Sequence, residues 1–216
     1  MNYMQQDKQM KIVVFGATGT TGSAVVERAL KLNYRVTAFV RSPEKVTIQH
    51  PNLTVFQGDV LDPVSVEKVV QGHDAVISSL GAGLNGTVRS QGTLNIIRAM
   101  EKHNVRRFIS QSSLGVGDSR SNLNFYWKYV MFGMLLRRAY ADHGVQEQYI
   151  KDSTLDWTIV RPGALKEGER TGQYRHGFAP HVKDIALEIS IPDTADFMVQ
   201  QVQDSMYLHD TPALSY

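Results

Sequence analysis

The 216-residue sequence contains no cysteine. Disulfide bonds, thiolate metal sites, iron–sulfur clusters and cysteine nucleophiles are therefore excluded. The chain also lacks a long apolar run, since its longest one, residues 129–136, is far shorter than the roughly 20 residues that span a bilayer. Its polar start, MNYMQQDKQ, does not resemble the apolar core of a signal peptide. These absences predict a cytoplasmic protein without a membrane span.

The sequence also lacks an excess of charge of either sign. The 23 Lys and Arg residues nearly balance the 21 Asp and Glu residues, which leaves a formal net charge of +2 and no block of like charges. Nucleic acid and anionic membranes are therefore not favoured as main partners. The seven histidines show no spacing typical of metal ligands, so no metal site is expected. No long apolar face stands out, and a monomer is the default expectation.

The pattern along the chain alternates between short apolar strands and amphipathic helices, in a composition that is 42% apolar and 20% charged. Strands are predicted at 11–15, 35–40, 53–56, 75–80, 107–111, 157–160 and 185–191, and helices at 23–32, 64–70, 92–102, 125–151 and 192–203. Residues 164–177 are predicted to form a glycine-rich, charged loop. Continuous apolar strands between helices are typical of parallel sheets with both faces covered.

The predicted fold is therefore α/β, a Rossmann-type doubly wound parallel sheet. We expect a polar N-terminal lead at 1–10 and a single NAD(P)-binding domain at 11–216, with a small C-terminal substrate-pocket region. In such sheets the ligand lies at the carboxyl ends of the strands, where the strand order reverses. Candidate functional residues are therefore those that directly follow each strand.

A glycine turn, GATGTTG, follows the first predicted strand and opens the first helix. Gly16, Gly19 and Gly22 would allow a tight turn, close approach of a pyrophosphate, and helix N–H groups aimed at it. The intervening Thr18, Thr20 and Thr21 belong to the same predicted phosphate site. Gly22 is followed by Ser23 and Ala24 rather than by the Lys-Ser/Thr pair of a Walker A loop, which disfavours hydrolysis of nucleoside triphosphates.

The second strand ends at Arg41 and Ser42, with Lys45 in the following turn. An NAD enzyme needs an acid near this position, whereas an NADP enzyme needs a cation for the 2′-phosphate. The planar guanidinium of Arg41 suits a phosphate, Ser42 adds a hydroxyl, and Lys45 could approach from the turn. The prediction is NADP(H) over NAD(H); the alternative is that Arg41 is merely a solvated charge at a strand end.

Four segments carry a family resemblance: GATGTTG, Gly58-Asp59-Val60, Ser112-Ser113 and the run DWTIVRPG at 156–163. Together they resemble the atypical, extended-type short-chain dehydrogenases/reductases, in the NAD(P)H-binding group that contains NmrA-like proteins. Length and the short C-terminal tail are most similar to the biliverdin reductase B and flavin reductase branch. The resemblance covers essentially the whole chain and specifies the cofactor more than the substrate.

The resemblance implies a cofactor contact from each of Asp59, Val60, Gly81, Ser112, Ser113, Pro162 and Gly163. By position, Asp59 and Val60 would line the adenine pocket, Gly81 would lie beside the ribose and phosphates, and the others would lie near the nicotinamide. Purely local roles are the alternative, since an aspartate can hold its own turn and a serine pair can satisfy nearby backbone groups.

No tyrosine in the chain has a lysine four residues later, so the Tyr-x-x-x-Lys pair of ordinary short-chain dehydrogenases is missing. Alcohol and ketone chemistry of the usual kind is therefore disfavoured. The flavin reductase branch does not need this pair, because hydride passes directly to a conjugated acceptor. Ser113 is the best catalytic candidate, as a hydrogen-bonding group near the nicotinamide or the acceptor.

Some members of the branch carry a histidine after the proline at position 162, whereas this chain has Gly163. His176 is a candidate substitute donor. The acceptor pocket is expected to be lined by apolar and aromatic residues from the 125–151 helix and the neighbouring loops: Leu114, Phe125, Trp127, Met131, Met134, Leu165, Tyr174, His176 and Phe178. About half of these are expected to be ordinary core.

The leading hypothesis is an NADPH-dependent reductase whose small-molecule acceptor is a flat aromatic or conjugated compound: a flavin, a biliverdin-like tetrapyrrole or a quinone. A non-catalytic, NmrA-like NADP(H) sensor is the first alternative. A regulatory or assembly role, in which the fold serves as a binding scaffold, is the second.

Overall fold

The computed structural model describes residues 9–81 and 87–216. Residues 1–8 of the predicted polar lead lie outside this range. The main sheet has the strand order β3-β2-β1-β4-β5-β6-β10-β8, and a two-stranded sheet pairs β7 with β9. The strands are β1 (Lys11–Phe15), β2 (Arg35–Val40), β3 (Leu53–Gln57), β4 (Ala75–Ser78), β5 (Arg107–Gln111), β6 (Asp156–Pro162), β7 (Ala164–Lys166), β8 (Arg175–His176), β9 (Glu188–Ser190) and β10 (Ala213–Ser215).

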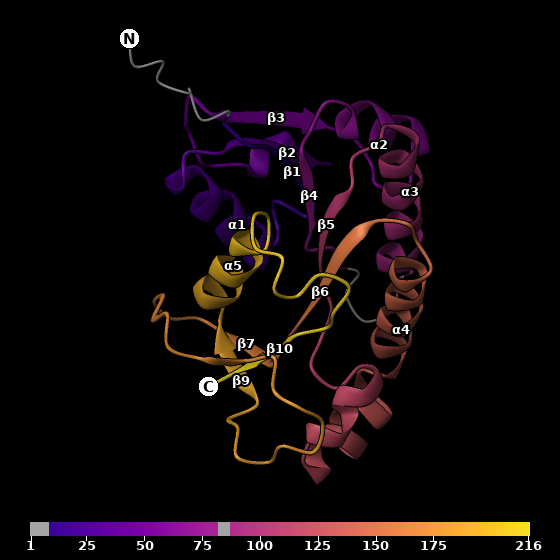
Figure 1. Ribbon diagram of the computed structural model, residues 1–216, viewed down its shortest axis with the longest axis vertical. Helices are drawn as coiled ribbons and strands as arrows, with labels where there is room; N and C mark the ends of the chain where they lie inside the picture. The colour runs from indigo at the N-terminus through magenta and orange to yellow at the C-terminus, as the bar shows by residue number, and fades with distance from the viewer. Residues whose placement is uncertain (1–8, 82–86) are drawn as a thin grey trace.

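Helices cover both faces of the main sheet, with α1 and α5 on one side and α2, α3 and α4 on the other (Figure 1). Their bounds are α1 (Thr20–Lys31), α2 (Pro63–Val70), α3 (Val88–Lys102), α4 (Arg137–Lys151) and α5 (Ile191–Gln200), with 3₁₀ turns η1 (Pro43–Lys45) and η2 (Gly117–Asn122) and a π-helix η3 (Tyr126–Leu135). The predicted Rossmann-type α/β fold is confirmed. Within the described residues, no helix is long and apolar enough to cross a membrane.

The reversal of strand order lies at β1, which pairs in parallel with β2 on one edge and with β4 on the other. Val14, for example, lies opposite Ala38 of β2 and Ile77 of β4. The chain moves outward from β1 to β3, and then returns across the sheet to β4. This reversal leaves a crevice at the carboxyl ends of β1 and β4, where ligands of doubly wound sheets bind.

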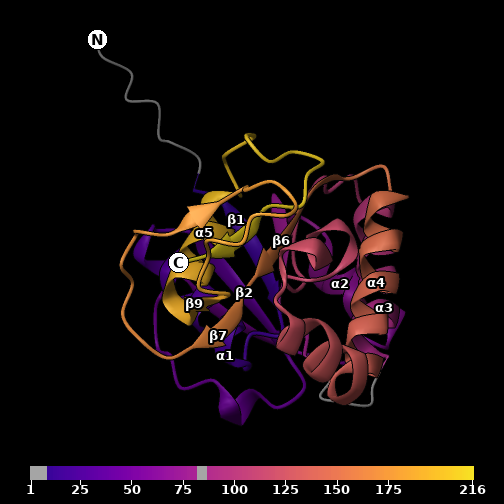
Figure 2. The same ribbon diagram turned by 90° about the horizontal axis from the view of Figure 1, so that it is seen from below.

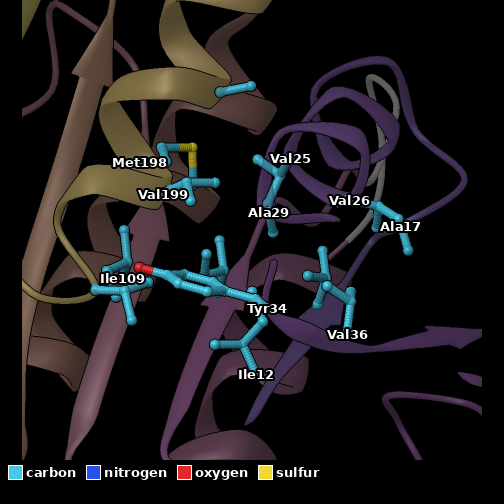
Figure 3. Close-up of a cluster of buried hydrophobic side chains, with 14 of the residues drawn as sticks. Ile12, Ala17, Val25, Val26, Ala29, Tyr34, Val36, Ile109, Met198 and Val199 are labelled. Atoms are coloured by element: carbon cyan, nitrogen blue, oxygen red, sulfur yellow. The ribbon is translucent and has the colours of Figure 1, made fainter. Parts of the chain in front are cut away.

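Side-chain alternation along β1 divides the core into two layers. Ile12 and Val14 point to the cluster under α1 and α5, whereas Val13 and Phe15 point to the cluster under α2 and α3. Figure 3 shows the first layer, in which Val25 and Ala29 of α1 face Met198 and Val199 of α5. Because all four β1 residues are fully buried, the strand has an apolar run rather than a polar face.

Helix starts follow local sequence. Asp62 caps α2 by accepting hydrogen bonds from the backbone N–H groups of Val64 and Ser65, and Pro63 occupies the first turn. Ser190 caps α5 in the same way through the N–H of Asp193. Each of these two helices therefore has a short polar N-cap residue followed by a proline in its first turn, which is a typical sequence signature of a helix start.

The predicted long helix at 125–151 is interrupted. The π-helix η3 ends at Leu135, and the N–H of Leu136 donates to the carbonyl of Met131 at 2.7 Å, a span of five residues, before α4 begins at Arg137. This i→i+5 bond inserts an extra residue into the turn and rotates the two segments relative to one another. Periodicity over the whole stretch could not show this break, because both segments are helical.

The C-terminal third is more ordered than the sequence indicates. The predicted loop at 164–177 contains β7 and β8, the strand predicted at 185–191 is reduced to β9, and β10 was not predicted. Seen from below in Figure 2, β7 and β9 lie beside the carboxyl end of β6. Strand β10 is only three residues long, and it is formed by pairing in parallel with β6 and antiparallel with β8.

Candidate functional site

The glycine turn after β1 is shaped by close backbone contacts. Gly16 has a φ of +79°, and a Cβ there would lie 2.3 Å from the carbonyl oxygen of Ser79. A Cβ on Gly22 would lie 2.1 Å from the carbonyl oxygen of Gly16. Gly19 closes the turn by donating its N–H to the same carbonyl at 2.9 Å. Glycine is therefore required sterically at positions 16 and 22, so that α1 can start against the strand.

The N-terminus of α1 is open to an anion. Its N-cap residue Gly19 makes no side-chain capping bond, and the first turn holds no acidic residue. This contrasts with α2 and α5, which Asp62 and Ser190 cap. Uncapped N–H groups and the positive end of the helix dipole suit a phosphate, so this end fits the pyrophosphate of a dinucleotide.

A cavity of about 220 Å³ extends from the glycine turn toward the ends of β2 and β3. Its lining includes Gly16, Thr18, Gly19, Phe39, Val40, Arg41, Gly58, Asp59, Val60 and Gly81. Arg41, which directly follows β2, is exposed and is one of the lining residues. Phe39 and Val60 supply apolar walls suited to an adenine ring. We call this the adenine-side cavity.

Asp59 lines this cavity and also holds its own turn, since its Oδ1 accepts the N–H of Leu61 at 2.9 Å. Ser42 and Lys45 do not line it. Ser42 precedes the 3₁₀ turn η1, and its carbonyl accepts the N–H of Lys45 at 3.1 Å. Because η1 turns away after β2, of the three predicted phosphate ligands only Arg41 reaches the cavity.

A larger cavity of about 490 Å³ lies on the other side of the glycine turn, over the ends of β4, β5 and β6. It shares Gly19, Ser79, Leu80 and Gly81 with the adenine-side cavity, so the two cavities lie side by side. A Cβ on Gly81 would meet no atom of residues 9–81 and 87–216 within 4 Å. We call this the acceptor-side cavity.

The acceptor-side cavity gathers most of the residues predicted for the nicotinamide and the acceptor. Those that line it are Thr20, Thr21, Gly81, Ser112, Ser113, Leu114, Trp127, Met131, Pro162, Gly163 and Leu165. Leu123, Leu136 and Leu187 add further apolar wall. The result is a largely hydrophobic chamber at one end of a dinucleotide-shaped groove.

The two adjacent serines have different environments. Ser112 is buried and donates its hydroxyl to Glu147 at 2.8 Å. Ser113 is partly exposed, and its hydroxyl makes a longer contact of 3.3 Å with the carbonyl of Leu114. Ser112 therefore supports the structure, whereas the Ser113 hydroxyl can turn to a ligand in the cavity.

Gly163 has a steric reason to be glycine. A Cβ at this position would lie 2.7 Å from the carbonyl carbon and oxygen of Leu187. The N–H of Ala164 also donates to that carbonyl at 2.7 Å, which ties the end of β6 to the segment before β9. A histidine side chain at 163 would require this backbone to move.

Several predicted acceptor contacts lie elsewhere. Phe125 is 74% exposed and Met134 is 78% exposed, so both point away from the cavity. Tyr174 and His176 pack against Phe197 of α5, and His176 Nδ1 lies 2.6 Å from the hydroxyl of Tyr207. The cause is strand β10, which pairs with β8 and draws this loop onto the opposite face.

Phe178 is also displaced from the cavity. It packs behind Leu114, against the small cluster of Leu123, Leu187 and Ala213. Its role is to support the cavity wall from outside rather than to contact a ligand. The expected positions of Phe125, Met134, Tyr174, His176 and Phe178 are thus corrected, whereas Leu114, Trp127, Met131 and Leu165 line the acceptor-side cavity.

Four polar residues of the acceptor-side cavity were missed: Ser79 after β4, Arg89 of α3, Gln111 of β5 and His143 of α4. Burial, with the nearby Arg89 cation, lowers the pKa of His143 to about 4, so its imidazole is neutral at pH 7. Its Nδ1 lies 3.1 Å from Gln146 Oε1, and Gln146 is oriented by donating its amide to Ser110 at 3.0 Å. The Nδ1 proton is therefore held by Gln146, which leaves Nε2 as an acceptor.

Arg89 lies 3.7 Å from Asp142 through its Nη1. Its Nε and Nη1 are buried without a hydrogen-bond partner among the described residues. A signal for this cluster was present in the sequence, because Asp142 and Gln146, like His143 and Glu147, are spaced four residues apart on one helix. A search for apolar periodicity alone does not detect such pairs of polar residues.

A Rossmann-type sheet with two cavities that meet at a glycine turn is the architecture of a dinucleotide-binding protein. A family model described as NAD(P)H-binding matches residues 16–205. The chain therefore belongs to the NAD(P)H-binding family, whose cofactor is a nicotinamide dinucleotide. Solved structures that it is similar to include an oxidoreductase and an epimerase-like protein of the atypical short-chain dehydrogenase/reductase type, as the sequence resemblance implies.

An uncharacterized chloroplastic protein of Arabidopsis thaliana is 31% identical over 220 residues, which span 90% of this chain and 77% of that protein. The oxidoreductase ylbE of Lactococcus lactis is 28% identical with a TM-score of 0.81, covering 95% of this chain and 90% of that one. ChuY of Escherichia coli O157:H7, described as an anaerobillin reductase, is 24% identical with a TM-score of 0.79, covering 95% and 96%, a likeness of fold.

Proposed function

We propose that the protein is an NADPH-dependent reductase that transfers hydride to a flat conjugated acceptor, such as a flavin, a biliverdin-like tetrapyrrole or a quinone. The observation that carries this proposal is that the two cavities lie side by side and share Gly19, Ser79, Leu80 and Gly81 as lining residues. One end offers a phosphate site and the other an apolar chamber. ChuY, which is described as an anaerobillin reductase, shares the fold.

The choice of NADPH rests on Arg41, whose exposed guanidinium lies at the rim of the adenine-side cavity. A guanidinium can bind the 2′-phosphate with two parallel hydrogen bonds, which a ribose hydroxyl cannot match. The open N-terminus of α1 would hold the pyrophosphate. Bound NADPH would supply the hydride at the acceptor-side cavity.

Catalysis by this chain would consist mainly of positioning. Leu114, Trp127, Met131 and Leu165 form walls against which a flat acceptor can lie, and they exclude water from the transfer path. Ser113 would donate a hydrogen bond to the acceptor or to the carboxamide of the nicotinamide. Hydride transfer to the acceptor requires one proton to balance it, and solvent at the open cavity mouth would deliver this proton.

The test is loss of NADPH absorbance with purified protein and a panel of FMN, FAD, riboflavin, biliverdin and small quinones, run beside NADH. We expect NADPH-selective turnover with at least one acceptor. Trp127→Ala should raise the KM for that acceptor, whereas Phe125→Ala, two residues away and outside the cavity, should not. Tight NADPH binding without turnover of any acceptor would contradict the reductase and favour the sensor that the sequence also allows.

A further inference from the structure

One face of the segment between η2 and α4 is apolar and exposed. Its side chains are Phe125, Tyr126, Tyr129, Val130, Met134 and Leu135, which we call the docking face. Phe125, Tyr126, Leu135 and Met134 are 74%, 56%, 63% and 78% exposed. The sequence did not single out such a face. Clustered large apolar side chains in water are unfavourable and usually mark an interaction surface.

The opposite face of the same segment is engaged by the fold. Trp127, Met131 and Leu136 line the acceptor-side cavity, and the backbone of η3 is tied by the N–H of Leu136. The docking face is therefore the outer side of a cavity wall. In Figure 1 the segment projects at the lower end of the molecule, beyond β5 and beside the start of α4.

The charged residues within the segment that carries the docking face are of one sign. Residues 119–141 contain no aspartate or glutamate but include Arg120, Lys128, Arg137 and Arg138. Arg137 and Arg138 follow the apolar residues directly, and Lys128 lies among them, with its Nζ 5.5 Å from the ring centre of Tyr129. The near balance of charge in the whole chain thus conceals a local excess of positive charge.

Exposed aromatic, methionine and leucine side chains flanked by basic residues match the chemistry of a membrane interface. Aromatic rings and aliphatic chains enter the boundary between headgroups and acyl chains, while lysine and arginine bind lipid phosphates. A neutral surface would not use the cations, and a nucleic acid would not use the aliphatic side chains.

We propose that the docking face, with Lys128, Arg137 and Arg138, binds the surface of an anionic lipid bilayer. The protein lies on the membrane through this segment and does not cross it. The wall formed by Trp127, Met131 and Leu136 is then adjacent to the lipid. If the reductase proposal holds, on which this one consequence rests, an apolar acceptor dissolved in the bilayer would have a short path to the cavity.

A second copy of the chain fits this surface less well. A two-fold symmetric dimer would bring the same basic segment of each copy together, and like charges across an interface are costly. An anionic bilayer instead supplies the opposite charge and an apolar interior at the same place. Charge complementarity therefore selects the lipid surface.

The first arm of the test is co-sedimentation of the full chain with vesicles of phosphatidylcholine alone or with 30% phosphatidylserine, without cofactor or acceptor. We expect binding to the anionic vesicles that falls as salt is raised. Phe125→Ser with Met134→Ser should abolish it. The matched control is Val64→Ser with Met206→Ser, which removes two apolar side chains of similar exposure, 59% and 69%, elsewhere on the surface.

The second arm removes charge. Lys128→Gln with Arg137→Gln should weaken binding about 30-fold, since each basic residue near an anionic surface contributes a factor of about five. Lys31→Gln with Arg98→Gln, exposed cations on α1 and α3, should leave it unchanged. Thermal unfolding and NADPH binding of each variant verify that it is folded. Because vesicle binding is measured without an acceptor, a loss of vesicle binding is distinguished from a failure of the reductase assay.

Absence of vesicle binding would overturn the proposal, as would binding that the serine variants retain. Equal binding to vesicles without phosphatidylserine would overturn the role of the cations. A concentration-dependent dimer in sedimentation velocity that Phe125→Ser and Met134→Ser dissolve, with no vesicle binding, would assign the docking face to a second copy instead.

Discussion

Arg161 and Glu147 form a paired ion bridge inside the protein, directly beneath the acceptor-side cavity. Arg161 Nε lies 2.9 Å from one carboxylate oxygen of Glu147, and Nη2 lies 2.6 Å from the other. Both side chains are almost fully buried, and Glu147 also accepts the hydroxyl of Ser112. Arg161 precedes Pro162 and Gly163 of the cavity wall. The pair therefore ties α4, β5 and β6 together at the site.

Breaking this pair should cost stability. Glu147→Gln leaves a buried guanidinium without its main counter-charge, and we expect the free energy of unfolding to fall by about 3 kcal/mol or more. Urea denaturation measures it. The matched change Glu188→Gln breaks the half-exposed pair with Lys166 and should have little effect. If the two substitutions lowered the free energy of unfolding equally, the buried pair would contribute no more to stability than the exposed one.

Arg41 should determine cofactor selectivity. Arg41→Ala removes the cation at the rim of the adenine-side cavity, and we expect the Kd for NADPH to rise by about 10- to 100-fold, as for loss of a charged hydrogen bond. The Kd for NADH should change little, because it has no 2′-phosphate. Fluorescence titration of both nucleotides provides the measurement. Arg35→Ala, at the opposite end of β2, is the control, and equal affinity of the wild type for both nucleotides would refute the NADP assignment.

His143 should make stability depend on pH. Its pKa is lowered to about 4 in the folded protein by burial, below the ordinary 6.5. The unfolded chain therefore binds a proton first, so His143 contributes stability that is present above about pH 6.5 and is lost as the pH falls toward 4. This corresponds to about 2 kcal/mol between pH 7 and pH 5.

His143→Gln should flatten the unfolding free energy over that pH range, as measured by urea denaturation at each pH. The same substitution at exposed His50 should leave the profile of the wild type. A His143→Gln profile as steep as the wild type would show that other groups carry the pH dependence.

The glycine turn should not tolerate a methyl group. Gly22→Ala places a Cβ 2.1 Å from the carbonyl oxygen of Gly16, so α1 must shift, and we expect destabilisation by about 2 kcal/mol or more with loss of NADPH binding. A Cβ on Gly144 in α4 meets nothing within 4 Å in the described part of the chain, so Gly144→Ala should stabilise the protein by about 0.5–1 kcal/mol. Thermal unfolding with and without NADPH distinguishes them. Unchanged NADPH binding in Gly22→Ala would refute the phosphate site at this turn.

The sequence by itself determined the Rossmann-type alternation of strands and helices, the glycine turn and the position of Arg41 directly after β2. These features are encoded locally: apolar runs form buried strands, and glycine is needed where the backbone turns against a neighbour. The gathering of Ser113, Pro162 and Gly163 at one cavity was also foreseeable, because parallel strands bring their carboxyl ends to the same edge of the sheet.

Only the tertiary structure decided the rest of the site. Tyr174 and His176 were expected at the acceptor, but β10 draws them to α5, and a strand of three residues has no signal apart from its partners. In the π-helix η3 and the residue before it, Trp127 and Met131 line the cavity while Phe125 and Met134 are exposed, a division that α-helical periodicity over 125–151 could not resolve. In both cases the direction of a side chain could not be predicted from local composition. For Tyr174 and His176 it depended on hydrogen bonds between segments far apart in the sequence, and for the 125–136 segment it depended on the type of helical turn.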